Sequence, residues 1–138
     1  MKPITLEEVL KYKPCSDGLK YIRSHSSLID AWNLCENVEW MIWLLSKLGL
    51  FTEPLARRFA CDCAEHTLHF FEDEYPDDKR LRHAIRFART LIDNPSAAWS
   101  AAQSAAQSAA QSAARSAGQA EEKWQCNKLR ELINPFKQ

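Results

Sequence analysis

The chain has few of the residues that break helices or build strands and tight loops. It holds three glycines and six prolines among 138 residues, and no stretch alternates apolar and polar side chains over the length of a strand. The three glycines are scattered, which excludes a glycine-rich loop that would cradle a phosphate. The sequence therefore predicts an all-α fold without a nucleotide-binding loop, and no motif for a cofactor is present.

The chain also lacks net charge, because 18 Lys and Arg residues balance 18 Asp and Glu residues. A dedicated nucleic-acid binder uses a positive field to neutralise phosphates, and this composition does not supply one. The longest apolar run, Trp40 to Leu45, is far shorter than the roughly 20 residues of a membrane span. The first ten residues lack the apolar core of a secretory signal. We therefore expect a cytoplasmic protein that does not associate with membranes.

The five cysteines are an odd number, and most of them fall within helical patterns. Reduced thiols are therefore expected rather than a disulfide framework. The chain is 46% hydrophobic, so 138 residues can bury one core without cross-links. These properties predict a single domain over residues 1–138.

Alanine is abundant, and it recurs in a four-residue repeat. Residues 96–119 read SAAWSAAQSAAQSAAQSAARSAGQ. Alanine is the best helix former, and Ser and Gln cost only about 0.1 to 0.5 kcal/mol each. Each repeat advances about 400°, so small side chains lie on every side of the helix. The repeat predicts a long, slim central helix over 96–117, a break near Gly118 and a C-terminal helix over 119–133.

Capping residues divide the rest of the chain into helices. Thr5, Ser27 and Thr52 each precede a stretch with helical apolar spacing, and the first two are followed three positions later by an acidic residue. Asp17 is the expected cap of a short helix, and Asn37 marks a break between two helices. With the alanine repeat, these signals predict a compact bundle of about six or seven helices.

Two consecutive predicted helices, 52–75 and 77–92, have the densest ordered charge in the chain. Phe70 is expected on the apolar face of the first, and Phe87 on the inward face of the second. The charged residues of this pair that we predict to contact a partner are Asp62, Glu65, His66, His69, Lys79, Arg82, Arg86 and Arg89.

The basic stripe of the second helix, which also includes His83, has three interpretations. Two helices joined by a tight turn lie antiparallel, so these side chains can neutralise the acidic segment FEDEYPDD within the domain. That interpretation is favoured on the residues alone. An acidic protein partner is the second interpretation, and nucleic acid is the third.

The segment CDCAEHTLH, residues 61–69, is the best candidate for metal binding. Cys61 and Cys63 project about 200° apart on a helix, so they cannot close on one ion. The two histidines lack the HExxH arrangement of zinc hydrolases, and the carboxylate–histidine pairs at i,i+4 chelate only weakly. A solvated face of i,i+4 pairs is the favoured interpretation, and no metal is expected.

The remaining chemistry-bearing residues point away from catalysis. Serines of the repeat lie mid-helix without a neighbouring histidine and acid, so nucleophilic catalysis is not expected. Trp32, Trp40, Trp43 and Trp124 are interpreted as core residues, with an aromatic pocket as the second interpretation.

Five segments taken in order carry a resemblance to a known family. They are AWNLCENVEWMIWLL, ARRFACDCAEHTL, YPDDKRLRHAIRFAR, the alanine repeat and EKWQCNKLREL. In that order they resemble small bacterial and phage-encoded immunity proteins of a type-five-like class, found near polymorphic toxins. Arg86 stands where similar sequences often carry an acidic residue, which makes the stripe more basic in this chain.

The resemblance implies a cytoplasmic, non-enzymatic inhibitor that occludes the working surface of a partner protein. The partner would be a toxin or, for a phage-encoded member, a host defence component such as a CRISPR complex. The alternative hypothesis is a metal-dependent or nucleic-acid-binding protein that uses the His66/His69 face and the Arg82/Arg86/Arg89 face.

Reversing Arg82, Arg86 and Arg89 together to Glu tests the interface hypothesis. If the three side chains face outward, we expect partner binding to be lost while circular dichroism and the melting temperature stay nearly unchanged. Unfolding of the triple variant would identify the stripe as an internal counterion, and normal binding would place the interface elsewhere.

Overall fold

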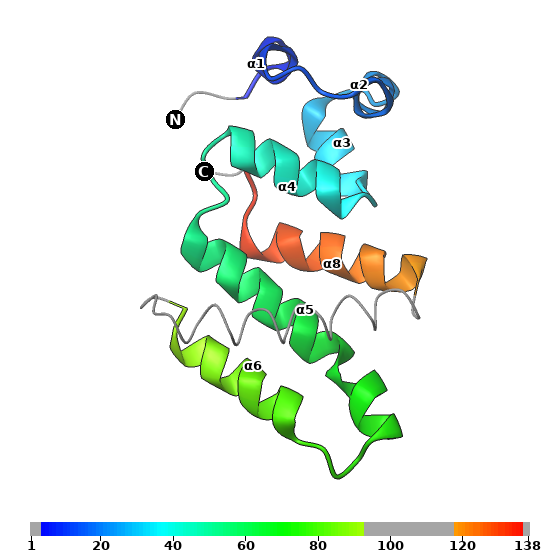
Figure 1. Cartoon of the computed structure of the whole chain (residues 1–138). Helices are drawn as coiled ribbons and strands as arrows, with labels where there is room; N and C mark the ends of the chain where they lie inside the picture. The colour runs from blue at the N-terminus through cyan, green and yellow to red at the C-terminus, as the bar shows by residue number, and fades with distance from the viewer. Residues whose placement is uncertain (1–3, 93–117, 137–138) are drawn as a thin grey trace. The chain divides into compact units, whose positions relative to one another are not determined.

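The computed structural model describes residues 4–92 and 118–136, and these residues form seven α-helices and no strand (Figure 1). The all-helical prediction is therefore confirmed. The predicted alanine-rich helix 96–117 lies outside the described residues. In chain order the helices are α1 (Leu6–Lys11), α2 (Ser16–Arg23), α3 (Leu28–Leu34), α4 (Val38–Lys47), α5 (Glu53–Glu74), α6 (Arg80–Thr90) and α8 (Gln119–Leu132).

Side-chain caps fix several helix starts as predicted. The Oγ1 atoms of Thr5 and Thr52 and the Oγ of Ser27 each accept a backbone N–H from three residues further on. Asn37 separates α3 from α4, and its Oδ1 caps α4.

The predicted cap of α2 was wrong. The Sγ of Cys15 accepts the Gly18 N–H at 3.4 Å, while Asp17 lies in the first turn. The helix begins at Ser16, two residues earlier than it would with Asp17 as its cap. A carboxylate in the first turn still favours the positive end of the helix dipole.

Gly118 lies directly before α8 and does not have a right-handed helical conformation. Its φ is 65°, in the left-handed region that favours glycine, and α8 begins at the next residue. The helix therefore does not continue through Gly118, as expected.

Contacts within the chain group it into two compact units. The first unit is Met1–Phe51 with Glu122–Gln138, and the second unit is Thr52–Glu121. The predicted single domain over residues 1–138 stays a prediction.

In the first unit, α8 is tied to the end of α3 and the start of α4. Arg130 Nη1 donates to the backbone carbonyls of Trp32 and Cys35 at 2.8 and 2.9 Å. The Val38 N–H donates to Glu122 at 3.4 Å. The core of this unit contains the buried side chains of Val9, Trp32, Met41, Leu45, Cys126 and Leu129.

In the second unit, α5 packs antiparallel to α6 through small and aliphatic side chains (Figure 1). Cys61 packs on Ala88, and Ile85 packs on Ala64 and Leu68. Small residues at the contact allow the two helix axes to approach closely.

Two phenylalanines expected on inward faces are exposed instead. Phe70 is 42% exposed and Phe87 is 49% exposed. At 100° per residue Phe87 projects 100° from Ala88 and 200° from Ile85. Because those two residues face α5, Phe87 is directed away from it. The predicted apolar faces were wider than the surface that the neighbouring helix covers.

Replacing Arg130 with Ala should lower the free energy of unfolding of the protein by about 2 to 4 kcal/mol. Hydrogen bonds from a charged donor contribute about 1.5 to 3 kcal/mol each, and the variant leaves two carbonyls without their donor. Urea unfolding followed by circular dichroism measures the change. The matched control is Arg23→Ala, an exposed arginine expected to change stability by less than about 0.5 kcal/mol. Equal effects of the two variants would contradict the assigned role of Arg130.

Candidate functional site

Arg89 of α6 reaches across to two carboxylates of α5. Its Nη2 donates to Asp62 at 2.8 Å, and its Nε donates to Glu65 at 2.7 Å. The Arg89 side chain is 34% exposed, so each pair is screened by solvent and adds little stability by itself. The pairs do fix the direction in which the guanidinium points.

Arg82, two turns before Arg89 on α6, forms a two-point (fork) contact with the carboxylate of Glu72 on α5. Its Nε donates to Glu72 at 2.9 Å, and its Nη2 contacts the other Glu72 oxygen. Lys79 Nζ lies 3.5 Å from the same carboxylate. The hydrogen bonds from Arg82 hold the pKa of Glu72 below its usual range.

The turn between α5 and α6 is closed by Asp78. Its Oδ1 accepts the backbone N–H of Arg80 at 3.1 Å, and its carboxylate also accepts from the Arg80 guanidinium. These hydrogen bonds lower the pKa of Asp78 to about 2. The formal cap residue Lys79 offers no side-chain hydrogen bond, so Asp78 supplies the missing acceptor at the start of α6.

The two histidines of α5 are both engaged through Nδ1. His66 Nδ1 lies 2.8 Å from a carboxylate oxygen of Glu121, which is 2% exposed. His69 Nδ1 lies 2.9 Å from the backbone carbonyl oxygen of His66, and its ring packs on Phe70 with 4.1 Å between centroids. In the described ranges, no three His, Cys, Asp or Glu side chains are grouped to hold a metal ion.

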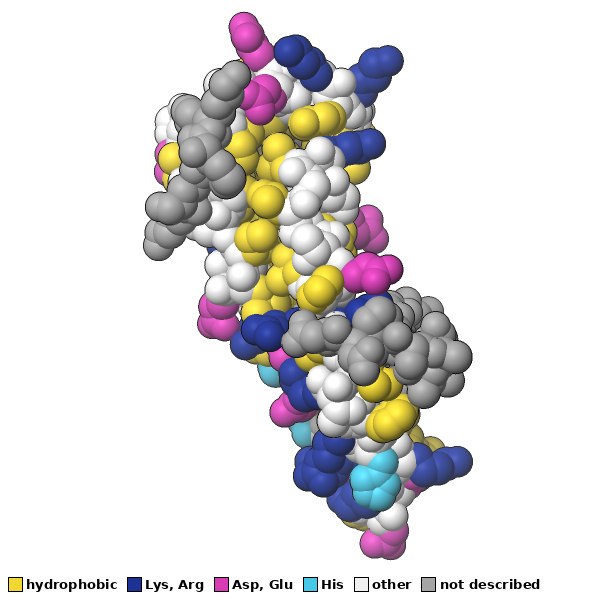
Figure 2. Space-filling model, turned by 90° about the vertical axis from the view of Figure 1, so that its left-hand side faces the viewer, with side chains coloured by type: hydrophobic (Ala, Val, Ile, Leu, Met, Phe, Trp, Pro, Cys, Tyr) yellow, Lys and Arg dark blue, Asp and Glu magenta, His cyan; other side chains and the backbone are white. Residues whose placement is uncertain are grey.

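The side of α6 that faces away from α5 carries a different set of side chains. On the face drawn in Figure 2, Lys and Arg side chains gather at the lower end of the molecule beside a histidine. Arg86 is exposed and has no ion-pair partner among the described residues. We call this surface the outer face of α6, and its exposed residues are His83, Arg86, Phe87 and Thr90.

The structure thus divides the basic stripe that the sequence presented as one unit. Arg82 and Arg89 are counterions of α5, while Arg86 is left for solvent or a partner. Charge reversal of all three would place new carboxylates beside Asp62, Glu65 and Glu72, so a change at Arg86 alone is the sharper test. The partner-binding role of the eight predicted residues stays a prediction.

Sequence reasoning missed Phe87, which was expected inside but lies on the outer face of α6. His83 was assigned to the basic stripe, although it was not among the eight residues predicted to contact a partner. A helical projection centred on the apolar residues Ile85 and Ala88 places both side chains on the side opposite to α5. That signal was present in the sequence.

A comparison with known families finds a match that covers the second unit and the next six residues of α8. A family model described as "Imm-5 like putative immunity protein" matches residues 52–127, more than half of the chain. The chain belongs to the Imm-5 like family. Neither the curated proteins nor the solved structures return a significant match.

The segment that defines this Imm-5 like protein contains α5, α6 and the first part of α8. All eight residues predicted to contact a partner lie inside it. Within the described ranges, no helix of the Imm-5 like chain is both long and apolar enough to span a bilayer.

Replacing Arg82 with Gln should raise the pKa of Glu72 toward the ordinary glutamate value of about 4.3. In the wild type, a folded-state pKa below the unfolded value means that Glu72 adds stability above the unfolded pKa and that this stability is lost as pH falls through the folded pKa. In Arg82→Gln, the contribution of Glu72 to the fall of folding stability at low pH should therefore disappear. Carboxyl ¹³C NMR titration measures the pKa directly.

The matched control for this titration is Arg86→Gln, which removes an arginine one turn further along α6 and should leave Glu72 unchanged. An identical Glu72 titration in wild type and Arg82→Gln would show that the fork does not form in solution.

Proposed function

We propose that this Imm-5 like protein is a non-enzymatic inhibitor that binds a partner effector and occludes its working surface. The observation that carries the proposal is the outer face of α6, where the exposed Arg86 lies next to Phe87, which is 49% exposed. The family description supports an immunity role. The effector is a toxin of the producing cell's own system or a component of a phage-defence system.

An arginine beside an exposed aromatic ring is the composition expected at the centre of a protein interface. Aromatic residues and Arg are enriched there, and a few of them dominate binding energy. Burying the Phe87 ring in a partner would remove apolar surface from water, which is favourable. The partner surface that fits is an apolar depression with an acidic rim.

The counterions on α5 support the same proposal. Glu72 holds Arg82, and Asp62 with Glu65 holds Arg89, so the flanks of the outer face of α6 are ordered before a partner arrives. Preorganised side chains lose less conformational entropy on binding. The basic groups also speed the encounter with an acidic surface.

The alternative, a metal or nucleic-acid function built on His66 and His69, has weaker support. His66 is bonded to the buried Glu121 and His69 to a carbonyl of its own helix, which are structural roles for both rings. The donors needed to complete a metal site are not grouped around them in the part of the chain that is described.

Affinity capture from the native host, followed by mass spectrometry, tests the proposal with three baits. They are the wild type, the double variant Arg86→Glu/Phe87→Ala, and Arg23→Glu. Arg23 is an exposed arginine of α2 outside the family match, so its reversal is the matched control. We expect one effector to be enriched by the wild type and the control and to be depleted at least about tenfold with the double variant.

The melting temperature of the double variant should stay close to that of the wild type, because both side chains are exposed. The purified effector should then lose its activity on addition of the wild-type protein. A captured toxin would identify an immunity role, and a captured defence component would identify an anti-defence role. Equal capture by all three baits, or stoichiometric zinc that disappears in His66→Ala, would contradict the proposal.

A further inference from the structure

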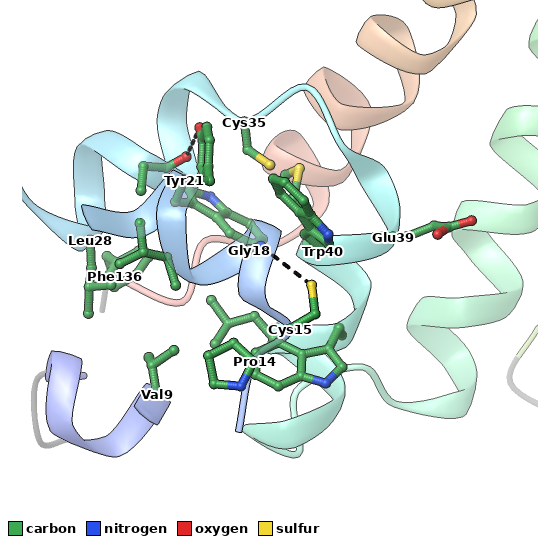
Figure 3. A pocket seen from close by; sticks show the side chains of 16 residues that line it. Val9, Pro14, Cys15, Gly18, Tyr21, Leu28, Cys35, Glu39, Trp40 and Phe136 are labelled. Atoms are coloured by element: carbon green, nitrogen blue, oxygen red, sulfur yellow. Dashed lines mark hydrogen bonds between the residues drawn. The ribbon is translucent and has the colours of Figure 1, made fainter. Parts of the chain in front are cut away.

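The first unit contains a cavity of about 350 Å³ that the proposed function does not use. Residues of α1 to α4 and the C-terminal segment line it, and the wall is largely aromatic and aliphatic (Figure 3). This volume is within the range of about 300 to 1,000 Å³ found for small-molecule sites. The aromatic members of the wall are Tyr21, Trp32, Trp40, Trp43 and Phe136.

A groove of about 840 Å³ adjoins this cavity in the same unit. Ile22, Leu28 and Phe136 belong to both walls, so the two spaces share a boundary. In Figure 3, Leu28 and Phe136 lie at one side of the cavity and Trp40 at the other. A molecule that extends from the Trp40 side past this boundary would therefore contact both walls.

The polar groups at the cavity wall already have partners within the protein. Tyr21 Oη donates to the carbonyl oxygen of Ala31 at 2.6 Å, and burial raises the pKa of Tyr21 to about 12, so this phenol stays neutral. Cys15 Sγ accepts a backbone N–H, as a dashed line in Figure 3 shows. Among the described residues of the wall, Glu39 is the one charged side chain, and it points away from the other labelled side chains. The cavity therefore suits an apolar group.

The groove carries charge of one sign. Among the described residues that line it, the titratable side chains are Arg23 and His25, and both are basic. Arg23 is exposed and has no ion-pair partner in the described part of the chain. The carboxylate of Asp30 already accepts a hydrogen bond from Ser26 of the groove wall at 2.6 Å. The groove therefore suits an anionic group.

The ring of His25 connects the two spaces. It packs on the ring of Tyr21 in the cavity wall with 4.4 Å between centroids, and its Nδ1 lies 2.8 Å from the Tyr21 carbonyl oxygen. Arg23 directly follows the shared wall residue Ile22 on α2. The basic groups are therefore positioned where the apolar cavity meets the groove.

We propose that the cavity and the groove together bind an aliphatic carboxylic acid, with its chain in the cavity and its carboxylate at Arg23 beside His25. The chain gains affinity because its apolar surface leaves water. The carboxylate matches a guanidinium, which can donate two parallel hydrogen bonds to it. This site is separate from the outer face of α6 and does not depend on the proposed inhibitor function.

Three probes with the same chain test the proposal on the full-length protein by NMR titration. They are octanoate, 1-octanol and octylammonium. In proportion to the apolar cavity of about 150 Å³ that holds benzene, the cavity has room for about 14 non-hydrogen atoms, which is enough for this chain. We expect octanoate to bind at least about threefold more tightly than octylammonium, because an exposed ion pair contributes about two- to fivefold. Hexanoate, which is two CH₂ groups shorter, should bind about tenfold more weakly than octanoate.

The variant Arg23→Gln removes the guanidinium and keeps a polar side chain. It should weaken octanoate about two- to fivefold and leave the affinity of 1-octanol unchanged. The matched control is Lys20→Gln, which removes an exposed cation of the same helix outside both walls and should leave both affinities unchanged. Both side chains are exposed, so neither variant should alter the fold.

Indole N–H signals in ¹H–¹⁵N NMR spectra report where the chain lies. Octanoate should shift the signals of Trp40 and Trp43, which line the cavity, and should leave that of Trp124, which lines neither space.

Four outcomes would each overturn the proposal. They are no binding of octanoate at millimolar concentration, equal affinities of octanoate and octylammonium, the same octanoate affinity in Arg23→Gln and Lys20→Gln, and unshifted Trp40 and Trp43 signals at saturation with octanoate.

Discussion

The packing of Ile85 and Ala88 against α5 is the contact on which the chemistry of α6 depends. A helix with two side chains fixed against a neighbour has no rotational freedom left, so every other residue is assigned a direction at 100° per position. Arg82 and Arg89 then fall beside the carboxylates of α5, and Arg86 with Phe87 falls on the far side. One small apolar contact thus sorts a uniform row of basic residues into counterions and free surface.

This sorting explains what the sequence could and could not predict. The starts of several helices could be predicted because a cap such as Thr5, Ser27 or Thr52 bonds a backbone N–H only three residues further on. Such a contact depends on the local sequence alone. The sequence favoured neutralisation of the segment FEDEYPDD by the basic stripe, and the pairing of Arg82 with Glu72 agrees with that interpretation. The pairing of Arg89 with Asp62 could not be predicted, because it depends on the axial register of two packed helices. The exposure of Phe87 was readable in principle, since it needed only the positions of Ile85 and Ala88 on the same helix.

The cavity of the first unit is a harder case for prediction. Its wall combines residues of four short helices with Phe136, whose separations along the chain are not related by any helical or strand period. Trp32 matched the expectation of a core residue, being almost fully buried, and it also lines the cavity. Periodicity identifies which residues are buried, but it does not identify gaps between them.

The thiol that caps α2 differs from the other four thiols of the chain in its exposure to solvent. Cys15 is exposed, whereas Cys35, Cys61, Cys63 and Cys126 are buried. Burial raises the pKa of Cys35 and of Cys61, and raises that of Cys126 to about 12, so these three thiols remain protonated and unreactive at neutral pH. A maleimide dye would therefore attach to a single position, and that position lies on the wall of the aromatic cavity. The wild-type protein, without any engineered cysteine, carries its own attachment point for an optical reporter of what enters the cavity.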